Sequence, residues 1–267
     1  MSTLRRRCVD SPGCTDLLET LRSDPRKGAK QLLAALERKQ RKAAEVQARL
    51  ETLLAVDRAM WSEGYRFAGV DEAGMSPWAG PIVAAAVILP PEARLEGVND
   101  SKSLPERQRE RMAEVVKASC VAWAVGTASP DEIARLNVYH AGLLAMRRAV
   151  AALRPRPNAL VVDARRVPGF QGYQRDLVKA DARCLSVAAA SILAKTTRDR
   201  FLRRLDQLYP SYGFARHKGY GVPEHASALR REGPSRHHRI SFDAVRQAMQ
   251  SAACGSRGDG ERMAGGA

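Results

Sequence analysis

The chain lacks several features that would point to a secreted, zinc-binding or membrane protein. It has only 5 cysteines among 267 residues and no CxxC pair, so the sequence indicates neither a disulfide framework nor a zinc site. The basic N-terminal stretch is followed by no apolar segment typical of a signal peptide. No apolar run approaches the roughly 18 residues of a membrane span. We therefore expect a cytoplasmic protein without a membrane partner.

The sequence is also poor in acidic residues relative to basic ones. It contains 44 Lys and Arg against 29 Asp and Glu, which gives a net charge of +15. Such an excess favours a polyanionic partner, nucleic acid before membrane, although a generally basic proteome would also produce it. With 45% hydrophobic residues the chain can still bury a full core, in one large domain or in one domain with an appendage.

Residues 1–64 are predicted to form an accessory helical region. Residues 1–23 carry little pattern, but Asp24-Pro25 resembles a helix N-cap followed by proline in the first turn. The segment after it has apolar residues at helical spacing up to about Ser62, and Gly64 closes it. This pattern fits a long helix or a helical hairpin. Its role could be to support the main domain or to bind a duplex through its basic face.

The stretch Tyr65–Leu89 contains an apolar run that ends in two adjacent carboxylates, Asp71 and Glu72. A turn rich in Gly and Pro leads from there to a second apolar run, so the stretch predicts two neighbouring strands in a hairpin. Two charges beside a core strand are costly unless something pairs with them. A divalent cation is the obvious candidate.

Strand and helix patterns continue along the chain and predict an α/β protein. The predicted elements are a helix from a Ser103/Glu106 capping box to about Ala118, a strand at 121–128, a helix at 130–153, strands at 159–162 and 174–179, and a helix at 185–209. The core positions expected in the second helix are Ile133, Leu136, Leu143, Leu144 and Val150. Lys102, just before the first helix, fits either a phosphate contact or a simple turn and cap.

The two later strands lead to Asp163 and Asp181, which repeats the arrangement at Asp71. A mixed sheet could gather these acids and Glu72 at one edge, where they would repel one another. Two Mg²⁺ or Mn²⁺ ions would resolve that repulsion and set up in-line phosphoryl transfer. Other acids near element ends pass the same loose test: Asp100, Asp131 and Asp176.

Residues 209–242 hold four of the five histidines, interleaved with Gly, Tyr and basic residues. Aromatic rings alternating with cations suit stacking on bases or sugars beside phosphate contacts. The histidines lack a zinc-like ligand set. Residues 251–267 are rich in Gly and Ser and are predicted to be a disordered tail.

Several long motifs of this sequence resemble bacterial ribonuclease HII. They are GVDEAG, NDSKSL, VVD, KADA, SVAAASILAKTTRDR, YPSYGFARHKGYGVPEH and HHRISF, in family order across about residues 65–243. The N-terminal segment resembles an extension seen in part of that family. The resemblance implies an α/β ribonuclease H-like fold, in which a central mixed β-sheet is flanked by helices and followed by a C-terminal helical part. The catalytic domain would then cover residues 65–250.

The resemblance also implies an activity. It is metal-dependent cleavage of the RNA strand of RNA–DNA hybrids and of the bond 5′ of ribonucleotides embedded in duplex DNA, leaving a 3′-hydroxyl and a 5′-phosphate. Such a reaction removes ribonucleotides in DNA repair and replication, and a monomer is expected. The resemblance places the catalytic, metal-binding carboxylates on Asp71, Glu72, Asp163 and Asp181. It implies a junction-sensing role for Tyr220 and backbone contacts for Lys102, Lys195 and Arg198.

The loop after the first acids departs from the family pattern. Family members carry Gly-Arg-Gly where this chain has Gly74, Met75 and Ser76, a loop that is expected to contact the nucleic acid. Met75 cannot supply the positive charge, and Ser76 adds a Cβ atom where glycine permits close approach. Trp78 stands where a smaller apolar residue is usual. Glycines usual beside the later acids are replaced by Ala164 and Ala180.

These departures leave two alternatives to the expected activity. The first is a nuclease shifted toward longer RNA–DNA hybrids, as in the related ribonuclease HIII, with weakened recognition of a single ribonucleotide. The second is a protein that holds hybrids through its basic surface without cutting them. The four carboxylates in family context argue against the second alternative.

Overall fold

The computed structural model describes residues 13–91, 93–98 and 104–258. The chain divides into two compact units, Met1–Thr52 and Leu53–Ala267. The boundary predicted after residue 64 therefore falls inside the second unit. The reason is that the last turns of the N-terminal helix carry Val56 and Met60, which pack in one core cluster with Phe67.

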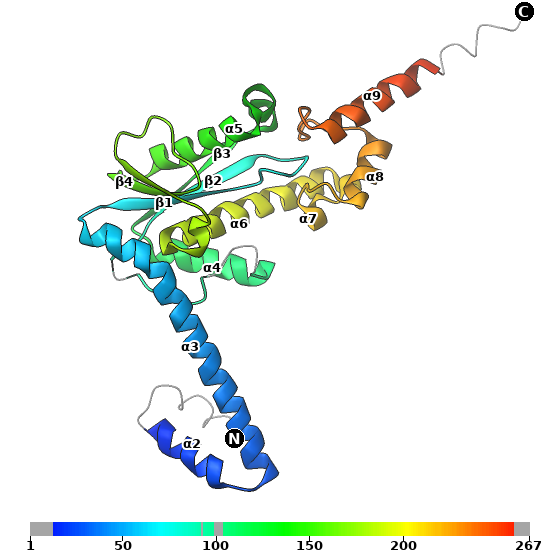
Figure 1. The fold of residues 1–267 in the computed structure, drawn as a ribbon. Helices are drawn as coiled ribbons and strands as arrows, with labels where there is room; N and C mark the ends of the chain where they lie inside the picture. Colours follow the sequence, from blue (N-terminus) through cyan, green and yellow to red (C-terminus); the bar gives the residue numbers. More distant parts are fainter. Residues whose placement is uncertain (1–12, 92, 99–103, 259–267) are drawn as a thin grey trace, which may run out of the picture. The chain divides into compact units, whose positions relative to one another are not determined.

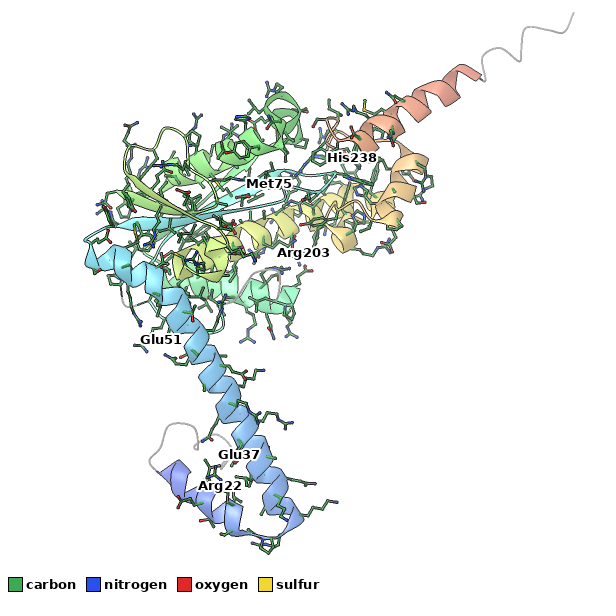
Figure 2. The ribbon with its side chains drawn as sticks, viewed as in Figure 1. Arg22, Glu37, Glu51, Met75, Arg203 and His238 are labelled. Carbon is green, nitrogen blue, oxygen red and sulfur yellow. The ribbon has the colours of Figure 1, made fainter. Side chains whose placement is uncertain are left out.

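The N-terminal unit contains helix α2 (Gly13–Ser23) and most of helix α3 (Lys27–Ser62). Of the two forms predicted for residues 24–62, the single long helix is confirmed, whereas α2 was not predicted. Asp24 accepts a hydrogen bond from the Arg26 N–H at 3.0 Å, so it shapes the turn between the helices. Arg22 and Glu37, labelled in Figure 2, form an ion pair of 3.3 Å between α2 and α3. Helix α3 ends at Ser62, and Gly64, with φ +78°, closes it as predicted.

The second unit is built on a mixed five-stranded sheet in the order β3-β2-β1-β4-β5. Its strands are β1 (Phe67–Ala73), β2 (Ile82–Ile88), β3 (Ala122–Ala128), β4 (Ala159–Asp163) and β5 (Tyr173–Leu177). The β1–β2 and β2–β3 pairs are antiparallel, and the β1–β4 and β4–β5 pairs are parallel. The predicted α/β class, mixed sheet and hairpin are confirmed. The last strand ends at Leu177, two residues earlier than predicted.

Helices cover both faces of this sheet (Figure 1). They are α4 (Glu106–Ser119), α5 (Pro130–Ala152) and α6 (Leu185–Leu208). Helix α5 packs on β2 and β3, α6 packs on β1 and β2, and α4 packs on α6. The small residues predicted for the face of α6 allow its backbone to approach β1 closely. A Cβ atom at Gly69 of β1 would lie 2.2 Å from the Ser186 carbonyl carbon, so this contact requires glycine.

Helix α5 differs from the prediction at one core position. Ile133, Leu143 and Val150 are buried as predicted and Leu144 is half-buried, but Leu136 is 41% exposed. Asn137 interrupts the helix with a φ of 66°, so residues on either side of it do not share one helical register. A single 3.6-residue period drawn through this break therefore assigned Leu136 to the wrong face.

Helix α4 begins without the predicted capping box. Its N-cap is Pro105, which makes no side-chain capping bond, and Ser103 lies outside the described residues. Glu106 instead pairs with Arg203 at 2.7 Å and with Lys218 at 3.3 Å. The Glu106 carboxylate thus forms ion pairs with Arg203 and Lys218 rather than capping α4.

The C-terminal part is helical, as predicted. It contains the 3₁₀ turn η2 (Pro210–Tyr212) and helices α7 (Phe214–His217), α8 (Pro223–Glu232) and α9 (Asp243–Gly258). The disordered tail predicted from residue 251 is therefore corrected, because residues 251–258 continue α9. Residues 259–267 lie outside the described part. None of the helices in that part is both long and apolar enough to cross a membrane.

Candidate active site at the ends of strands β1 and β4

Two neighbouring parallel strands bring Asp71 and Asp163 to the same edge of the sheet. Strands β1 and β4 pair up to Val70 and Val162, and the two acids are the next residues on each strand. Asp71 is 6% exposed. Burial raises its pKa well above the ordinary value, and repulsion from Glu72 and then from Asp163 raises it further. Asp71, Glu72 and Asp163 therefore lie at the same edge of the sheet, near enough to repel one another.

Asp181 is not at the end of a strand but on a short turn close to the same edge. The turn is the 3₁₀ helix η1 (Ala180–Ala182), which lies between β5 and α6. Asp163 accepts a hydrogen bond of 2.9 Å from the Ala180 N–H, so its carboxylate holds this turn against the end of β4. The prediction that Asp181 ends a strand is therefore wrong, because β5 ends at Leu177 and Asp181 lies on this turn.

The four carboxylates have the chemistry that a hard divalent cation prefers, but their arrangement in this structure does not form an ion site. Carboxylate oxygens are the ligands that Mg²⁺ and Mn²⁺ prefer, and a cation would offset the repulsion that raises the pKa of Asp71. Among the described residues, however, no three His, Cys, Asp or Glu side chains are grouped so that they could hold an ion. The Glu72 Oε1 atom is paired with Arg165 Nη1 at 3.1 Å. The donor set fits a metal provided that Glu72 exchanges this arginine for the ion.

Arg165 contacts the candidate site, and the sequence analysis did not predict it. Besides Glu72, its Nη1 atom contacts the sulfur of Met75 at 3.8 Å. Its guanidinium carbon lies 5.3 Å from the centre of the Tyr139 ring. The sequence offers no signal that separates it from the adjacent Arg166, because only the fold decides which of the two points at the carboxylates.

The loop that connects β1 to β2 is held by a fully buried arginine, Arg239. Its three nitrogens donate to backbone carbonyls of the loop, at Gly74 (2.6 Å), Met75 (3.0 Å) and Gly80 (2.9 Å). Arg239 directly follows His238 in the chain; His238 and Met75 are labelled in Figure 2 and mark the two segments that Arg239 joins. Burial, with the Arg198 charge nearby, lowers the pKa of Arg239 to about 9, which leaves it protonated at neutral pH.

Arg198 also holds the loop between β1 and β2. Its predicted contact with the substrate backbone is therefore corrected. The side chain is fully buried. Its nitrogens donate to the carbonyls of Ala79 (3.0 Å), Pro81 (3.2 Å) and Lys218 (3.0 Å), so it joins the loop to α7. Gly74, with φ +95°, lies against it, and a Cβ atom there would be 2.2 Å from Arg198 Nε. Arg198 positions the loop rather than a phosphate.

The remaining residues predicted for nucleic-acid binding have different surroundings. Tyr220 is 40% exposed, and Lys195 Nζ lies 5.7 Å from its ring centre. Lys195 is also paired with Asp199 at 2.7 Å. In the loop, Met75 is half-buried and Ser76 is exposed. Lys102 lies outside the described residues.

Three buried histidines pack together next to the segment that carries Tyr220. They form the histidine cluster His217, His225 and His238. The Ser235 N–H donates to His238 Nδ1, so we assign the proton of that ring to Nε2, which donates to His225 Nε2 at 3.1 Å. His225 Nδ1 then donates to the Tyr220 carbonyl at 2.9 Å. Burial lowers the pKa of His225 and of His238 to about 4. His225 and His238 are therefore neutral at neutral pH, and in the described part of the chain no group of ligating side chains that could hold a metal ion is found.

Comparisons with known proteins match both units. The family model described as Ribonuclease HII matches residues 68–245, and the model described as Ribonuclease HII N-terminal domain matches residues 8–61. Ribonuclease HII of Myxococcus xanthus (strain DK1622) is 51% identical over 241 residues, which cover 90% of this chain and 82% of the relative.

Two solved structures share the fold. The ribonuclease H2 from Pyrococcus horikoshii OT3 matches with a TM-score of 0.61 and 28% identity, over 69% of this chain and 97% of that chain. Bst-RNase HIII, solved in complex with Mn²⁺, matches with a TM-score of 0.55 and 24% identity, over 70% of each chain. The second likeness concerns the fold alone.

Proposed function

Because this chain belongs to the ribonuclease HII family and is a ribonuclease H-type endonuclease, we propose that it cuts at ribonucleotides within DNA as well as in RNA–DNA hybrids. In an embedded site the cut would fall 5′ of the ribonucleotide and leave a 3′-hydroxyl and a 5′-phosphate. The observation that carries the proposal is the placement of Asp71 and Asp163 on adjacent parallel strands with Glu72 beside them.

The residues proposed to hold two divalent ions, Mn²⁺ or Mg²⁺, are Asp71, Glu72, Asp163 and Asp181. When bound, such ions supply Lewis acidity and neutralise the charge that develops on the phosphate. The protein's own contribution is to hold the acids at one sheet edge. Asp71 is fixed by the Glu72 N–H at 2.8 Å, and Asp163 by the Ala180 N–H at 2.9 Å.

Substrate recognition is proposed to use the loop Gly74–Ser76 and the Tyr220 ring. Arg239 holds the loop at the carbonyls of Gly74 and Met75, so the loop can meet the nucleic acid without first being ordered. The exposed Tyr220 ring offers a surface on which a sugar can stack, with Lys195 nearby. The 2′-hydroxyl is the group that distinguishes RNA from DNA at such a site.

The test is cleavage of two substrates, a duplex with one embedded ribonucleotide and a long RNA–DNA hybrid, each with Mn²⁺ and with Mg²⁺. We expect the wild type to cut both and Asp71→Asn to lose about 10³-fold or more in kcat/KM, because it removes a charged ligand at the centre of the site. Asp176→Asn is the matched control, since Asp176 is an exposed acid on β5, and it should stay within about twofold.

The outcomes separate the alternatives. Absence of cleavage of either substrate with either ion would overturn the proposed activity and favour a hybrid-binding protein. Equal activity of Asp71→Asn and wild type would show that the site lies elsewhere. Cleavage of the long hybrid with little cleavage at the single ribonucleotide would favour the shifted specificity suggested by Met75 and Ser76.

We also propose that the enzyme acts as a monomer in the cytoplasm, in the removal of ribonucleotides during DNA repair and replication. The absence of a membrane-crossing helix among the described residues and the bacterial relatives support this location. Light scattering on the purified chain tests the monomer, and a mass of twice the chain mass would contradict it.

A further inference from the structure

We propose that Arg165 contacts the substrate phosphate and supplies the positive charge that the loop Gly74–Ser76 lacks. The inference rests on the proposed function, since it assigns a residue to the same site. It concerns a side chain that no motif of the sequence singled out.

The position of Arg165 is the first argument. Its Nη1 atom is 3.1 Å from Glu72 Oε1 and 3.8 Å from Met75 Sδ, so the cation lies between the carboxylates and the loop. Position 75 itself carries an uncharged thioether. A phosphate that approaches the carboxylates along this loop would therefore meet the Arg165 guanidinium beside Met75.

The surroundings of Arg165 keep the guanidinium in this place. Its carbon lies 5.3 Å from the Tyr139 ring centre, and such stacking pre-organises the planar fork of an arginine. Helix α5 also makes room for it at Gly142. A Cβ atom there would be 3.0 Å from Arg165 Nη1 and 3.2 Å from Met75 Sδ. Three segments, β1, the loop and α5, thus converge on one cation.

The hydrogen-bonding pattern leaves capacity for a ligand. Within the described residues, the polar contacts of the guanidinium involve Nη1 alone, at Glu72 and Met75. An arginine has five N–H donors and binds phosphate best with two of them in parallel, so Nη2 and Nε remain for an oxyanion. The side chain is 19% exposed, which lets a ligand reach it while water is largely excluded.

A purely local role would be neutralisation of Glu72, and the two roles predict different results. A counter-ion of Glu72 competes with a metal for the same carboxylate oxygen. Loss of such a counter-ion would therefore change the affinity for the metal without weakening the binding of the substrate. A phosphate contact is felt in substrate affinity and in its dependence on salt.

The experiment compares Arg165→Gln with Arg166→Gln. Arg166 is the adjacent, exposed arginine, so each variant removes one charge from the same segment. We expect Arg165→Gln to lower kcat/KM on the embedded ribonucleotide about 10- to 100-fold, mainly through KM, and to reduce the slope of log(kcat/KM) against log[salt] by about 1. Arg166→Gln should stay within about twofold.

A second variant moves the charge rather than removing it. Met75→Arg in the Arg165→Gln background returns a cation to the loop, and we expect it to restore most of the lost kcat/KM. Calorimetric titration with Mn²⁺ in the absence of substrate gives a readout independent of activity. Arg165→Gln should bind Mn²⁺ at least as tightly as wild type, which shows that its loss of kcat/KM does not come from a lost metal ion. Thermal unfolding of each variant checks that it is folded.

Three results would overturn the inference. They are an unchanged kcat/KM in Arg165→Gln, an equal loss in Arg166→Gln, and a failure of Met75→Arg to restore activity in a folded double variant. In each case the wild type still cleaves, so the proposed function stands. If the wild type does not cleave either substrate, the proposed function itself has failed and the inference falls with it.

Discussion

Ala164, directly after Asp163, has a backbone conformation that alanine rarely adopts. Its φ is +50°, and its N–H donates to the Leu177 carbonyl at 3.0 Å. The left-handed region costs a residue with a Cβ atom about 1–2 kcal/mol. Ala164 is the residue between Asp163 and Arg165, so the strained conformation lies between a proposed metal ligand and a proposed phosphate contact.

We predict that Ala164→Gly stabilises the protein slightly, by about 0.5–1 kcal/mol, because relief of the strained φ outweighs the larger entropy of glycine in the unfolded chain. Ala151→Gly, at an exposed position of α5 without positive φ, should have the opposite sign and cost about 1 kcal/mol. Urea unfolding of both variants measures the difference. A loss of stability in Ala164→Gly equal to that in Ala151→Gly would contradict the strain argument.

At the scale of elements, the N-terminus of α6 is capped by a residue far away in the sequence. The N-cap of α6, Cys184, makes no side-chain capping bond. Asp57 of α3 instead accepts the N–H groups of Leu185 at 2.7 Å and of Ser186 at 3.0 Å. The carboxylate also faces the positive end of the helix dipole. Because α6 packs on β1, this contact between helices supports the strand that carries Asp71.

Asp57→Ala is predicted to destabilise the protein by about 2–4 kcal/mol, since it leaves two buried N–H groups without their acceptor. Asp57→Asn retains one acceptor and should cost less. Glu63→Ala, an exposed acid just beyond α3, serves as the control and should change the free energy of unfolding by less than about 0.5 kcal/mol. Chemical denaturation measures all three. Equal stabilities of Asp57→Ala and Glu63→Ala would refute the capping role.

At the scale of the whole molecule, stability against acid depends on two buried histidines, His225 and His238. The pKa values of His225 and His238 are lowered to about 4 by burial, while an unfolded histidine titrates near 6.5. Between these values the unfolded chain binds more protons than the folded one. The contribution is therefore complete above about pH 6.5 and is lost as the pH falls toward 4.

We predict that the free energy of unfolding falls between pH 6.5 and 4.5, by at most about 3 kcal/mol for each of the two histidines. Asp57 and Asp71 act in the opposite direction, because their raised pKa values make the folded state bind a proton at a higher pH than the unfolded chain does. Unfolding measured in both the wild type and Asp71→Asn isolates the contribution of Asp71. The fall should be steeper in Asp71→Asn, and a free energy independent of pH in that variant would contradict the prediction.

Much of the fold could be predicted from the sequence because its signals are local. Apolar runs bounded by Gly and Pro identified β1, β2 and β4, and helical periodicity identified α3, α5 and α6. The predictions failed where a local rule met a non-local contact or a break in the helix. Leu136 was misassigned because of the irregular Asn137, and Glu106 pairs with Arg203 instead of capping α4.

By itself, the sequence determined which acids are available, the order of the elements and the family to which they belong, since these depend on residue identity and short-range spacing. Only the tertiary structure decided what the arginines do. Arg198 and Arg239 are buried and hold the loop, whereas Arg165 reaches Glu72 and Met75. The physical reason is that the partners of a long, charged side chain are set by segments far apart in the chain, and spacing along the sequence carries no record of them.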